Sequence, residues 1–216
     1  MEWLFLNLFI FFLIIIIRLW WILPKNTTAN GLQKQRLHPC STCIILGSGG
    51  HTAEMEQLIK GLDENKYQPR TYVYANNDQL SRAKIQQLEQ NYFTNSFSKT
   101  QYYGIPRARN IKQSLLTTPW SFWLALKASI KVLYMTMPDT VICNGPGSCL
   151  PLCILSFLMK FIGIKHITLV YIESYARVHE LSLTGKLLYG WVDLFLVQWP
   201  DLIKKYPKAQ YHGILV

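Results

Sequence analysis

Short apolar segments recur along this chain, and each is followed by a turn and a stretch with helical spacing. They lie at residues 42–46, 71–75, 140–143, 167–172 and 194–197, with helices expected at 53–62, 79–90, 120–135, 150–162 and 184–190. Such alternation predicts a parallel sheet covered by helices on both faces. We therefore expect one α/β, Rossmann-like domain over residues 40–205, with an irregular stretch at 101–110.

Residues 3–23 form a second, different unit. They are apolar except for Asn7 and Arg18, and about 20 such residues span a bilayer core. A cleaved signal peptide is the alternative, but it needs a basic start and a shorter apolar stretch, and only Glu2 precedes this one. We predict a transmembrane anchor over residues 1–23 and a polar linker over 24–39.

Charge indicates both the orientation and the partners. Arg18, Lys25, Lys34 and Arg36 lie at or beyond the C-terminal end of the apolar segment, so the positive-inside rule predicts a cytosolic domain. The net charge is +10, which suits an anionic membrane surface or a phosphate-bearing substrate. The basic residues are spread out rather than clustered, which argues against nucleic-acid binding.

The cysteines do not indicate a metal or redox site. There are five of them, an odd number that is typical of a reducing compartment. Cys40 and Cys43 form a CxxC pair that leads into a strand, whereas a thioredoxin-like pair opens a helix. A zinc site would need further ligands at suitable spacing. We expect free thiols, with neither metal nor cofactor.

The strongest local motif follows the first expected strand and precedes a helix. It contains Gly47, Ser48, Gly49, Gly50 and His51. Glycines let the backbone approach an anion, and the N–H groups at a helix start bind it. The motif lacks the Lys-Ser/Thr of a Walker A loop and the third glycine of a dinucleotide fingerprint. A diphosphate is the expected ligand of this motif, and a tight structural turn is the alternative. His51 is a candidate general base or a hydrogen-bond donor to a phosphate, and a structural role is its alternative.

A second turn of this kind follows the strand at 140–143. Its residues Asn144, Gly145, Gly147 and Ser148 again open a helix. Because the carboxyl ends of parallel strands share one edge of a sheet, the two turns should line one crevice.

Charged residues follow other strands. Glu173 is a candidate proton acceptor or sugar ligand, and Arg177 a candidate diphosphate ligand, although the two are also spaced as an i, i+4 helix pair. Arg107 and Arg109 suit a diphosphate or an anionic lipid, or else a solvated loop.

The expected helices at 120–135 and 150–162 are unusually apolar. Both are too short to span a bilayer. Burial in the core is the favoured interpretation, and contact with a membrane surface is the alternative.

Several motifs together resemble one family, the membrane subunit of the two-chain UDP-N-acetylglucosamine transferase of dolichol-linked oligosaccharide assembly (asparagine-linked glycosylation protein fourteen). They are LGSGGHTAEM (46–55), IPRARN (105–110), ICNGPGSCLP (142–151), IESYARV (172–178), LSLTGKLLY (181–189) and QWP (198–200). The family is similar to the N-terminal half of a bacterial lipid-linked glycosyltransferase with the GT-B fold. The resemblance therefore implies the acceptor-side half of a GT-B enzyme.

The resemblance also implies a function. The chain would recruit a soluble, UDP-GlcNAc-binding catalytic subunit to the endoplasmic reticulum membrane, and the complex would add the second N-acetylglucosamine to GlcNAc-diphospho-dolichol. The chain alone would be inactive, with His51 and Glu173 as candidates for local chemistry. The partner would dock on the tail at 206–216, through Tyr211, Ile214, Leu215 and Val216. A pure membrane scaffold and an NAD-dependent membrane reductase are the rival functions.

Overall fold

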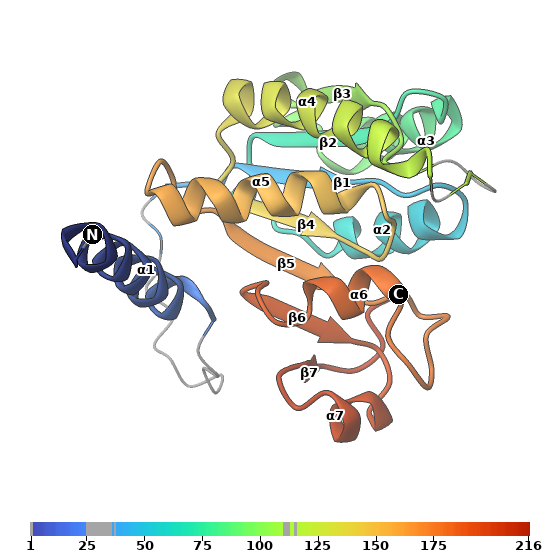
Figure 1. The fold of residues 1–216 in the computed structure, drawn as a ribbon. Helices are drawn as coiled ribbons and strands as arrows, with labels where there is room; N and C mark the ends of the chain where they lie inside the picture. The colour runs from blue at the N-terminus through green and yellow to red at the C-terminus, as the bar shows by residue number, and fades with distance from the viewer. Residues whose placement is uncertain (1, 25–35, 37, 110–112, 115) are drawn as a thin grey trace.

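The computed structural model describes residues 2–24, 36, 38–109, 113–114 and 116–216, so most of the expected linker lies outside the described residues. Its centre is a seven-stranded sheet with the order β3-β2-β1-β4-β5-β6-β7, in which every neighbouring pair is parallel (Figure 1). The strands are β1 (Thr42–Ile45), β2 (Arg70–Ala75), β3 (Gln101–Ile105), β4 (Thr140–Cys143), β5 (Thr168–Ile172), β6 (Leu194–Val197) and β7 (Gln210–Tyr211). The predicted parallel α/β fold is confirmed.

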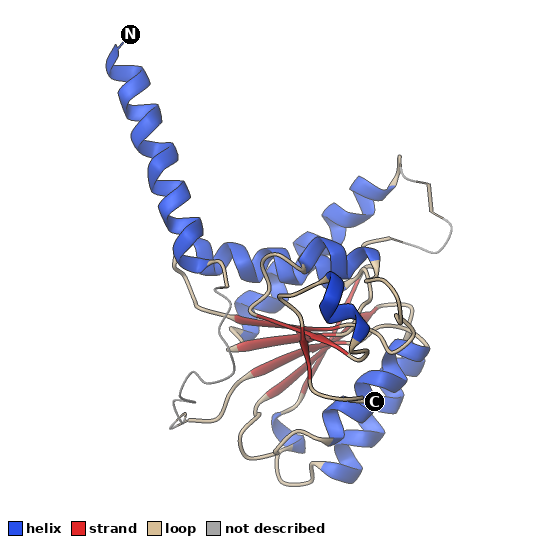
Figure 2. Ribbon diagram, turned by 90° about the horizontal axis from the view of Figure 1, so that it is seen from below, coloured by secondary structure: helices blue, strands red, loops and turns tan. Residues whose placement is uncertain are grey.

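Helices lie on both sides of this sheet (Figure 2). They are α2 (Gly50–Lys60), α3 (Gln79–Tyr92), α4 (Thr118–Thr136), α5 (Cys149–Ile162), α6 (Leu183–Leu188) and α7 (Asp201–Lys205), with a 3-10 turn at Phe97–Lys99. Helix α1 (Glu2–Ile22) projects away from the domain (Figure 2). Alternate residues of β1 enter the two cores, because strand side chains point to opposite faces. Cys43 and Ile45 pack in the core under α4, α5 and α6, while Ile44 packs in the core under α2 and α3.

The second face of the sheet is only partly covered, which corrects the expectation of helices on both faces throughout. Helices α2 and α3 cover β1 and β2, but Ile142, Val170, Leu194 and Leu196 on β4, β5 and β6 remain only partly buried. They line an apolar groove of 380 Å³ that Leu215 also borders. Parallel sheets are normally buried on both faces, whereas the described residues leave this part of the face open.

Two parts of the chain differ from the sequence-based expectation. The stretch predicted as irregular contains strand β3, whose pattern is obscured by Gly104 and by an edge position that leaves most of its residues exposed or half-buried. A Cβ atom at Gly104 would displace the Asn76 side-chain amide, which packs against it. The tail predicted at 206–216 contributes β7, which pairs with β6 in the same sheet.

Helix α1 is attached to the end of α5. The Arg18 Nε donates to the Phe161 carbonyl at 2.8 Å and its Nη2 donates to the Lys160 carbonyl at 3.1 Å. These carbonyls belong to the last turn of α5, which lacks intrahelical partners for them. Among the described residues, Trp3–Ile22 is the one helix long and apolar enough to cross a membrane.

Candidate functional site

The predicted turns meet at the carboxyl edge of the sheet, where they enclose a cavity of 220 Å³. The walls come from the turn after β1, the turn after β4 and the segment after β3. Of the predicted site residues, the cavity brings together Gly47, Ser48, His51, Arg107, Arg109, Gly147 and Ser148. Gly49 and Gly50 lie exposed beside it, whereas Asn144 and Gly145 lie buried beneath it.

His51 is held between the two glycine turns. A Cβ atom on Gly47 would lie 2.5 Å from the His51 Cβ, and one on Gly145 would lie 2.8 Å from the His51 Cε1. Gly145 also has a φ of +81°, which side chains disfavour. The motif therefore needs glycine at both positions because the imidazole occupies the space where their side chains would be.

Glu54, which the sequence analysis missed, lies behind the imidazole. Its Oε2 is 3.9 Å from the His51 Nδ1, and its Oε1 accepts from the Ser174 Oγ at 2.7 Å. Asn144 donates to the His51 carbonyl at 2.7 Å and to Glu54 at 3.4 Å. The i, i+3 spacing from His51 was the available signal. The Glu54 carboxylate therefore lies close enough to interact with the positive charge that the imidazole gains when it takes up a proton.

The cavity also suits an anion. Helices α2 and α5 both begin at its edge, and N-terminal helix N–H groups attract negative charge. Arg107 and Arg109 line the cavity and are steadied by bonds to the Asn77 Oδ1 at 3.0 Å and the Gln113 carbonyl at 3.2 Å. Ser148 occupies the N-cap position of α5 without a side-chain capping bond, so its hydroxyl is not committed to the helix.

The Gly47 carbonyl is turned away from this anion site. The Thr52 Oγ1 donates to it, and the Ser81 Oγ lies 3.3 Å from it. Holding this acceptor inside the fold keeps its negative end away from the cavity, where it would repel a phosphate.

Glu173 and Arg177 lie outside the residues that line the cavity. Glu173 is buried and accepts from the Ser174 N–H at 3.1 Å and from the Ser182 N–H at 2.9 Å. Burial raises the pKa of its carboxyl group. These bonds tie the loop after β5 to the start of α6. Arg177 is exposed and lies outside any helix, so the alternative i, i+4 helix pair does not form.

The residues predicted to dock the partner lie on and after β7, the edge strand that pairs with β6. Tyr211 is the last residue of β7, and Ile214 is 55% exposed. The Leu215 N–H donates to the Gln198 Oε1 at 3.3 Å, and its side chain borders the open apolar groove. Val216 is half-buried.

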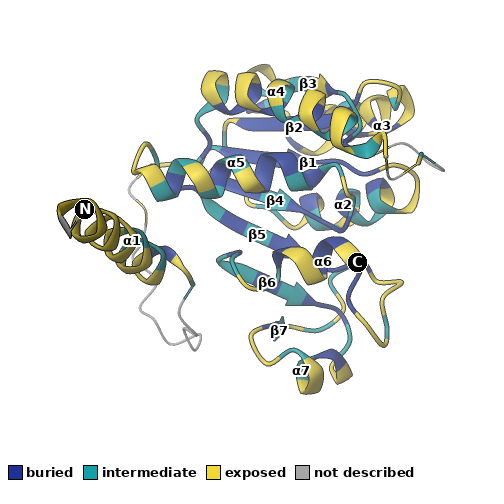
Figure 3. Ribbon diagram, in the orientation of Figure 1, coloured by how far each residue is buried: buried dark blue, intermediate teal, exposed yellow. Residues whose placement is uncertain are grey.

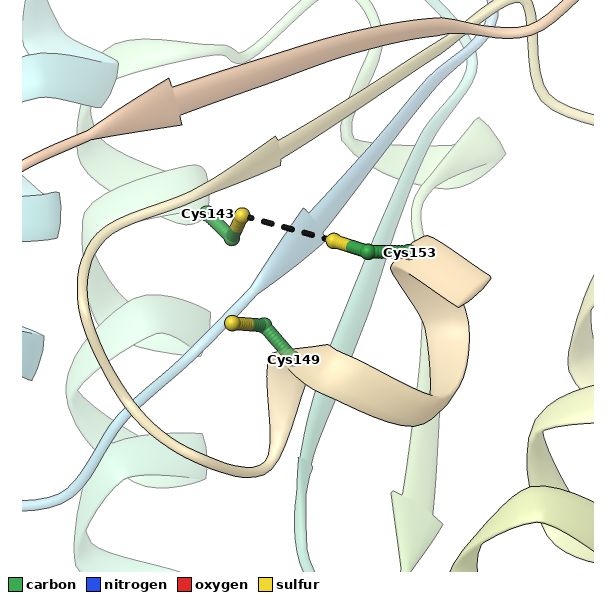
Figure 4. A group of neighbouring side chains, drawn as sticks. All are labelled: Cys143, Cys149 and Cys153. Carbon is green, nitrogen blue, oxygen red and sulfur yellow. Dashed lines mark hydrogen bonds between the residues drawn. The ribbon is translucent and has the colours of Figure 1, made fainter. Parts of the chain in front are cut away.

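Three buried thiols form the one group among the described residues whose ligand atoms could hold a metal ion. The sulfur atoms of Cys143, Cys149 and Cys153 lie within 4.8 Å of one another, and those of Cys143 and Cys153 are 3.7 Å apart (Figure 4). Burial raises the pKa of the Cys149 thiol, whereas hydrogen bonds from Cys143 and Cys149 lower the pKa of the Cys153 thiol. The three thiols belong to the apolar core cluster, where they pack as small side chains. Cys40 and Cys43 are likewise buried and free.

The fold is similar to that of larger solved enzymes. MurG from Acinetobacter baumannii aligns with a TM-score of 0.55 and 15% identity over 76% of this chain. A UDP-N-acetylglucosamine 2-epimerase from Rickettsia bellii aligns with a TM-score of 0.52 and 16% identity over 82% of it. The chain spans only 43% and 46% of these two proteins.

Relatives of similar length are much closer in sequence. The UDP-N-acetylglucosamine transferase subunit alg14 of Schizosaccharomyces pombe is 43% identical over 88% of both chains. Subunits named ALG14 from Rattus norvegicus and Homo sapiens are 40% and 38% identical over 94% of this chain and 93% and 92% of their own. The profile of the family "Oligosaccharide biosynthesis protein Alg14 like" matches residues 42–215. The chain therefore belongs to the Alg14 family.

Proposed function

We propose that this chain is the membrane-anchored, acceptor-side subunit of a UDP-GlcNAc transferase that adds the second N-acetylglucosamine to GlcNAc-diphospho-dolichol. The observation that carries the proposal is the cavity between the two glycine turns, with His51 on its wall and two arginines beside it. It offers a proton acceptor next to an anion site, which a diphosphate-linked sugar acceptor requires. The names of the relatives support the transferase subunit role.

The reaction is an inverting displacement. The acceptor hydroxyl oxygen forms a bond to the anomeric carbon of the donor as the bond to UDP breaks, and His51 takes the hydroxyl proton. Glu54, 3.9 Å from the His51 Nδ1, stabilises the imidazolium that results. Arg107, Arg109 and the starts of α2 and α5 hold the acceptor diphosphate. Glu173 contributes by fixing the loop after β5 rather than by proton transfer.

A second chain completes the enzyme. The 216 residues hold one Rossmann-like sheet, and the MurG chain is more than twice as long as the part that aligns. The open groove on β4, β5 and β6, bordered by Leu215, supports docking of an apolar segment of the soluble UDP-GlcNAc-binding subunit there. Tyr211 and Ile214 extend this surface along the tail.

The anchor determines where the complex works. Helix α1 suits a single membrane span, and the positive residues that follow it favour a cytosolic domain. The lipid acceptor and a soluble donor subunit then meet at the cytosolic face of the endoplasmic reticulum. Residues 1–23, 40–205 and 206–216 serve as anchor, acceptor domain and docking tail.

Reconstitution tests the proposal. The full chain and a candidate UDP-GlcNAc-binding subunit are assayed for transfer to a GlcNAc-diphospho-lipid, together and singly. We expect activity only together. His51→Ala should abolish most transfer while leaving partner capture intact, and His179→Ala, at an exposed histidine that does not line the cavity, is the matched control. Transfer by this chain alone would contradict the subunit role, and normal transfer by His51→Ala would favour a pure scaffold.

A further inference from the structure

The helices on one side of the sheet are apolar on their outer surface as well as on their inner one. Helix α4 buries Ala125, Val132 and Leu133 against the sheet, which confirms core burial for that side only. The exposed apolar residues of the three helices are Trp120, Trp123, Leu124, Ile130, Tyr134 and Met135 on α4, Ile154, Leu158 and Ile162 on α5, and Leu183 and Leu187 on α6. We call these residues the apolar helix face (Figure 3).

Spacing and packing show that this face continues from α4 onto α5. On α4 its members are adjacent or three to six residues apart, with Lys127 in the longest gap, and at 100° per residue they share one side of the helix. Trp120 is 69% exposed and Tyr134 is 75% exposed, near opposite ends of α4. Helix α5 packs beside α4, and Ile154 borders an open apolar hollow of 330 Å³ on its surface. Apolar patches of this extent mark interaction sites on soluble domains.

The helices on the other side of the sheet serve as an internal comparison. Helix α3 exposes Arg82, Lys84, Gln87 and Gln90, the ordinary polar surface of a helix that faces water. Its one strongly exposed aliphatic side chain is Leu80, at 78%. The apolar helix face is therefore a property of one side of the domain rather than of the whole chain.

Charge selects the kind of partner. The sequences of α4, α5 and α6 contain no aspartate or glutamate. Lys127 and Lys131 are exposed among the apolar residues of α4, and the Lys127 ammonium lies 5.7 Å from the centre of the Trp123 ring. Aliphatic side chains, tryptophan and lysine on one helix surface are typical of helices that lie in a membrane interface with anionic lipids.

The anchor brings the bilayer to the same side. Arg18 ties α1 to the last turn of α5, and α1 rises from that point on the side of the sheet that carries α4 and α5 (Figures 1 and 2). A membrane crossed by α1 therefore runs past the apolar helix face.

We propose that the apolar helix face lies in the surface of the leaflet from which α1 emerges, so that α4, α5 and α6 form a second, monotopic membrane contact. This inference rests on the proposed role of α1 as a membrane anchor. The start of α5 at Cys149 adjoins the cavity turn, and its far end adjoins the anchor. The contact thus extends about 20 Å from the anchor to the cavity. A lipid-linked acceptor could reach the cavity without leaving the interface.

Depth-sensitive labelling of the full chain in vesicles tests the contact. All five native cysteines are buried, so an environment-sensitive maleimide fluorophore reports mainly an introduced cysteine. Ile130→Cys and Leu158→Cys place it on the apolar helix face, and Leu80→Cys on α3 is the matched control. The vesicles contain phosphatidylcholine with or without phosphatidylserine, and nitroxide-labelled lipids serve as quenchers.

We expect the fluorophores at positions 130 and 158 to show blue-shifted emission and to lose most of their fluorescence to the nitroxide lipids, while the one at 80 behaves as in water. Lys127→Glu with Lys131→Glu should reduce this quenching, most strongly in the phosphatidylserine vesicles at low salt. Water-like emission at 130 and 158 in a chain that floats with the vesicles would overturn the inference and leave the anchor intact. Blue-shifted emission without quenching would mean a protein partner instead and would also overturn it. Failure to float would overturn the anchor and the contact together.

Discussion

Replacing Gly145 with alanine tests the arrangement that holds the His51 ring. The added Cβ atom would lie 2.8 Å from the His51 Cε1 and 3.3 Å from its Nδ1. The ring would therefore have to rotate away from this turn to make room for the added atom. Backbone and side chain both resist the change, since Gly145 has a φ of +81°.

The backbone strain and the steric contact each have an expected cost. A left-handed conformation costs a residue other than glycine about 1–2 kcal/mol, and overpacking costs about 1–3 kcal/mol more. The free energy of unfolding should fall by the sum of these contributions. For a domain of this size each kcal/mol lowers the melting temperature by roughly 2–4 °C, so thermal unfolding of the full chain in detergent will resolve the change.

A double-mutant cycle isolates the contact itself. His51→Ala removes the ring, so Gly145→Ala made in that background should cost only the backbone contribution, a coupling of about 1–3 kcal/mol. Gly50→Ala is the matched control, because a Cβ there meets nothing within 4 Å. Gly50 is the first residue of α2, and alanine is the better helix former by up to about 1 kcal/mol, so that variant should melt at the same or a higher temperature.

The result that would refute this reasoning is additivity. If Gly145→Ala costs as much without the His51 ring as with it, the ring is not held by that turn. The glycine would then serve the backbone conformation alone.

Two further predictions concern buried carboxylates. Glu89→Gln should lower the free energy of unfolding by about 3–5 kcal/mol, because Glu89 pairs with the fully buried Arg70 at 2.6 Å. Glu180→Gln, which breaks an exposed pair with Lys186, is the control and should leave the melting temperature unchanged. Equal effects of the two substitutions would contradict the role of burial. The second concerns Glu173, whose pKa is raised by burial above the ordinary 4.5, so the folded chain binds more protons than the unfolded chain between the ordinary and the raised value. The wild type should therefore gain stability relative to Glu173→Gln as the pH falls through that window and lose it as the pH rises, and a pH-independent difference between the two melting temperatures would count against it.

Features that depend on local spacing were predictable from the sequence. Residues 3–23 predicted the membrane-length helix because only length and apolarity matter for spanning a bilayer. Strands β1 and β4 were expected within a residue of their observed bounds, because each is apolar and ends at a glycine turn. Parallel strands place their carboxyl ends together, so the meeting of those two turns at one edge also followed from sequence order.

Features that depend on neighbouring elements could not be predicted from the sequence. Strand β3 was missed because an edge strand that contains Gly104 carries a weak apolar pattern, and Glu54 because its relation to Ser174 spans 120 residues. Only the sheet order reveals that β4, β5 and β6 keep one open apolar face.

For the anchor and the apolar helices, too, the sequence determined some properties and the tertiary structure determined others. The sequence alone determined that α1 is apolar throughout and that α4 and α5 are apolar on more than one side. Only the tertiary structure decided which side of each helix meets the sheet, because burial of one stripe depends on the elements packed against it. The bond from Arg18 to the end of α5 then puts the remaining apolar side and the anchor on the same side of the domain.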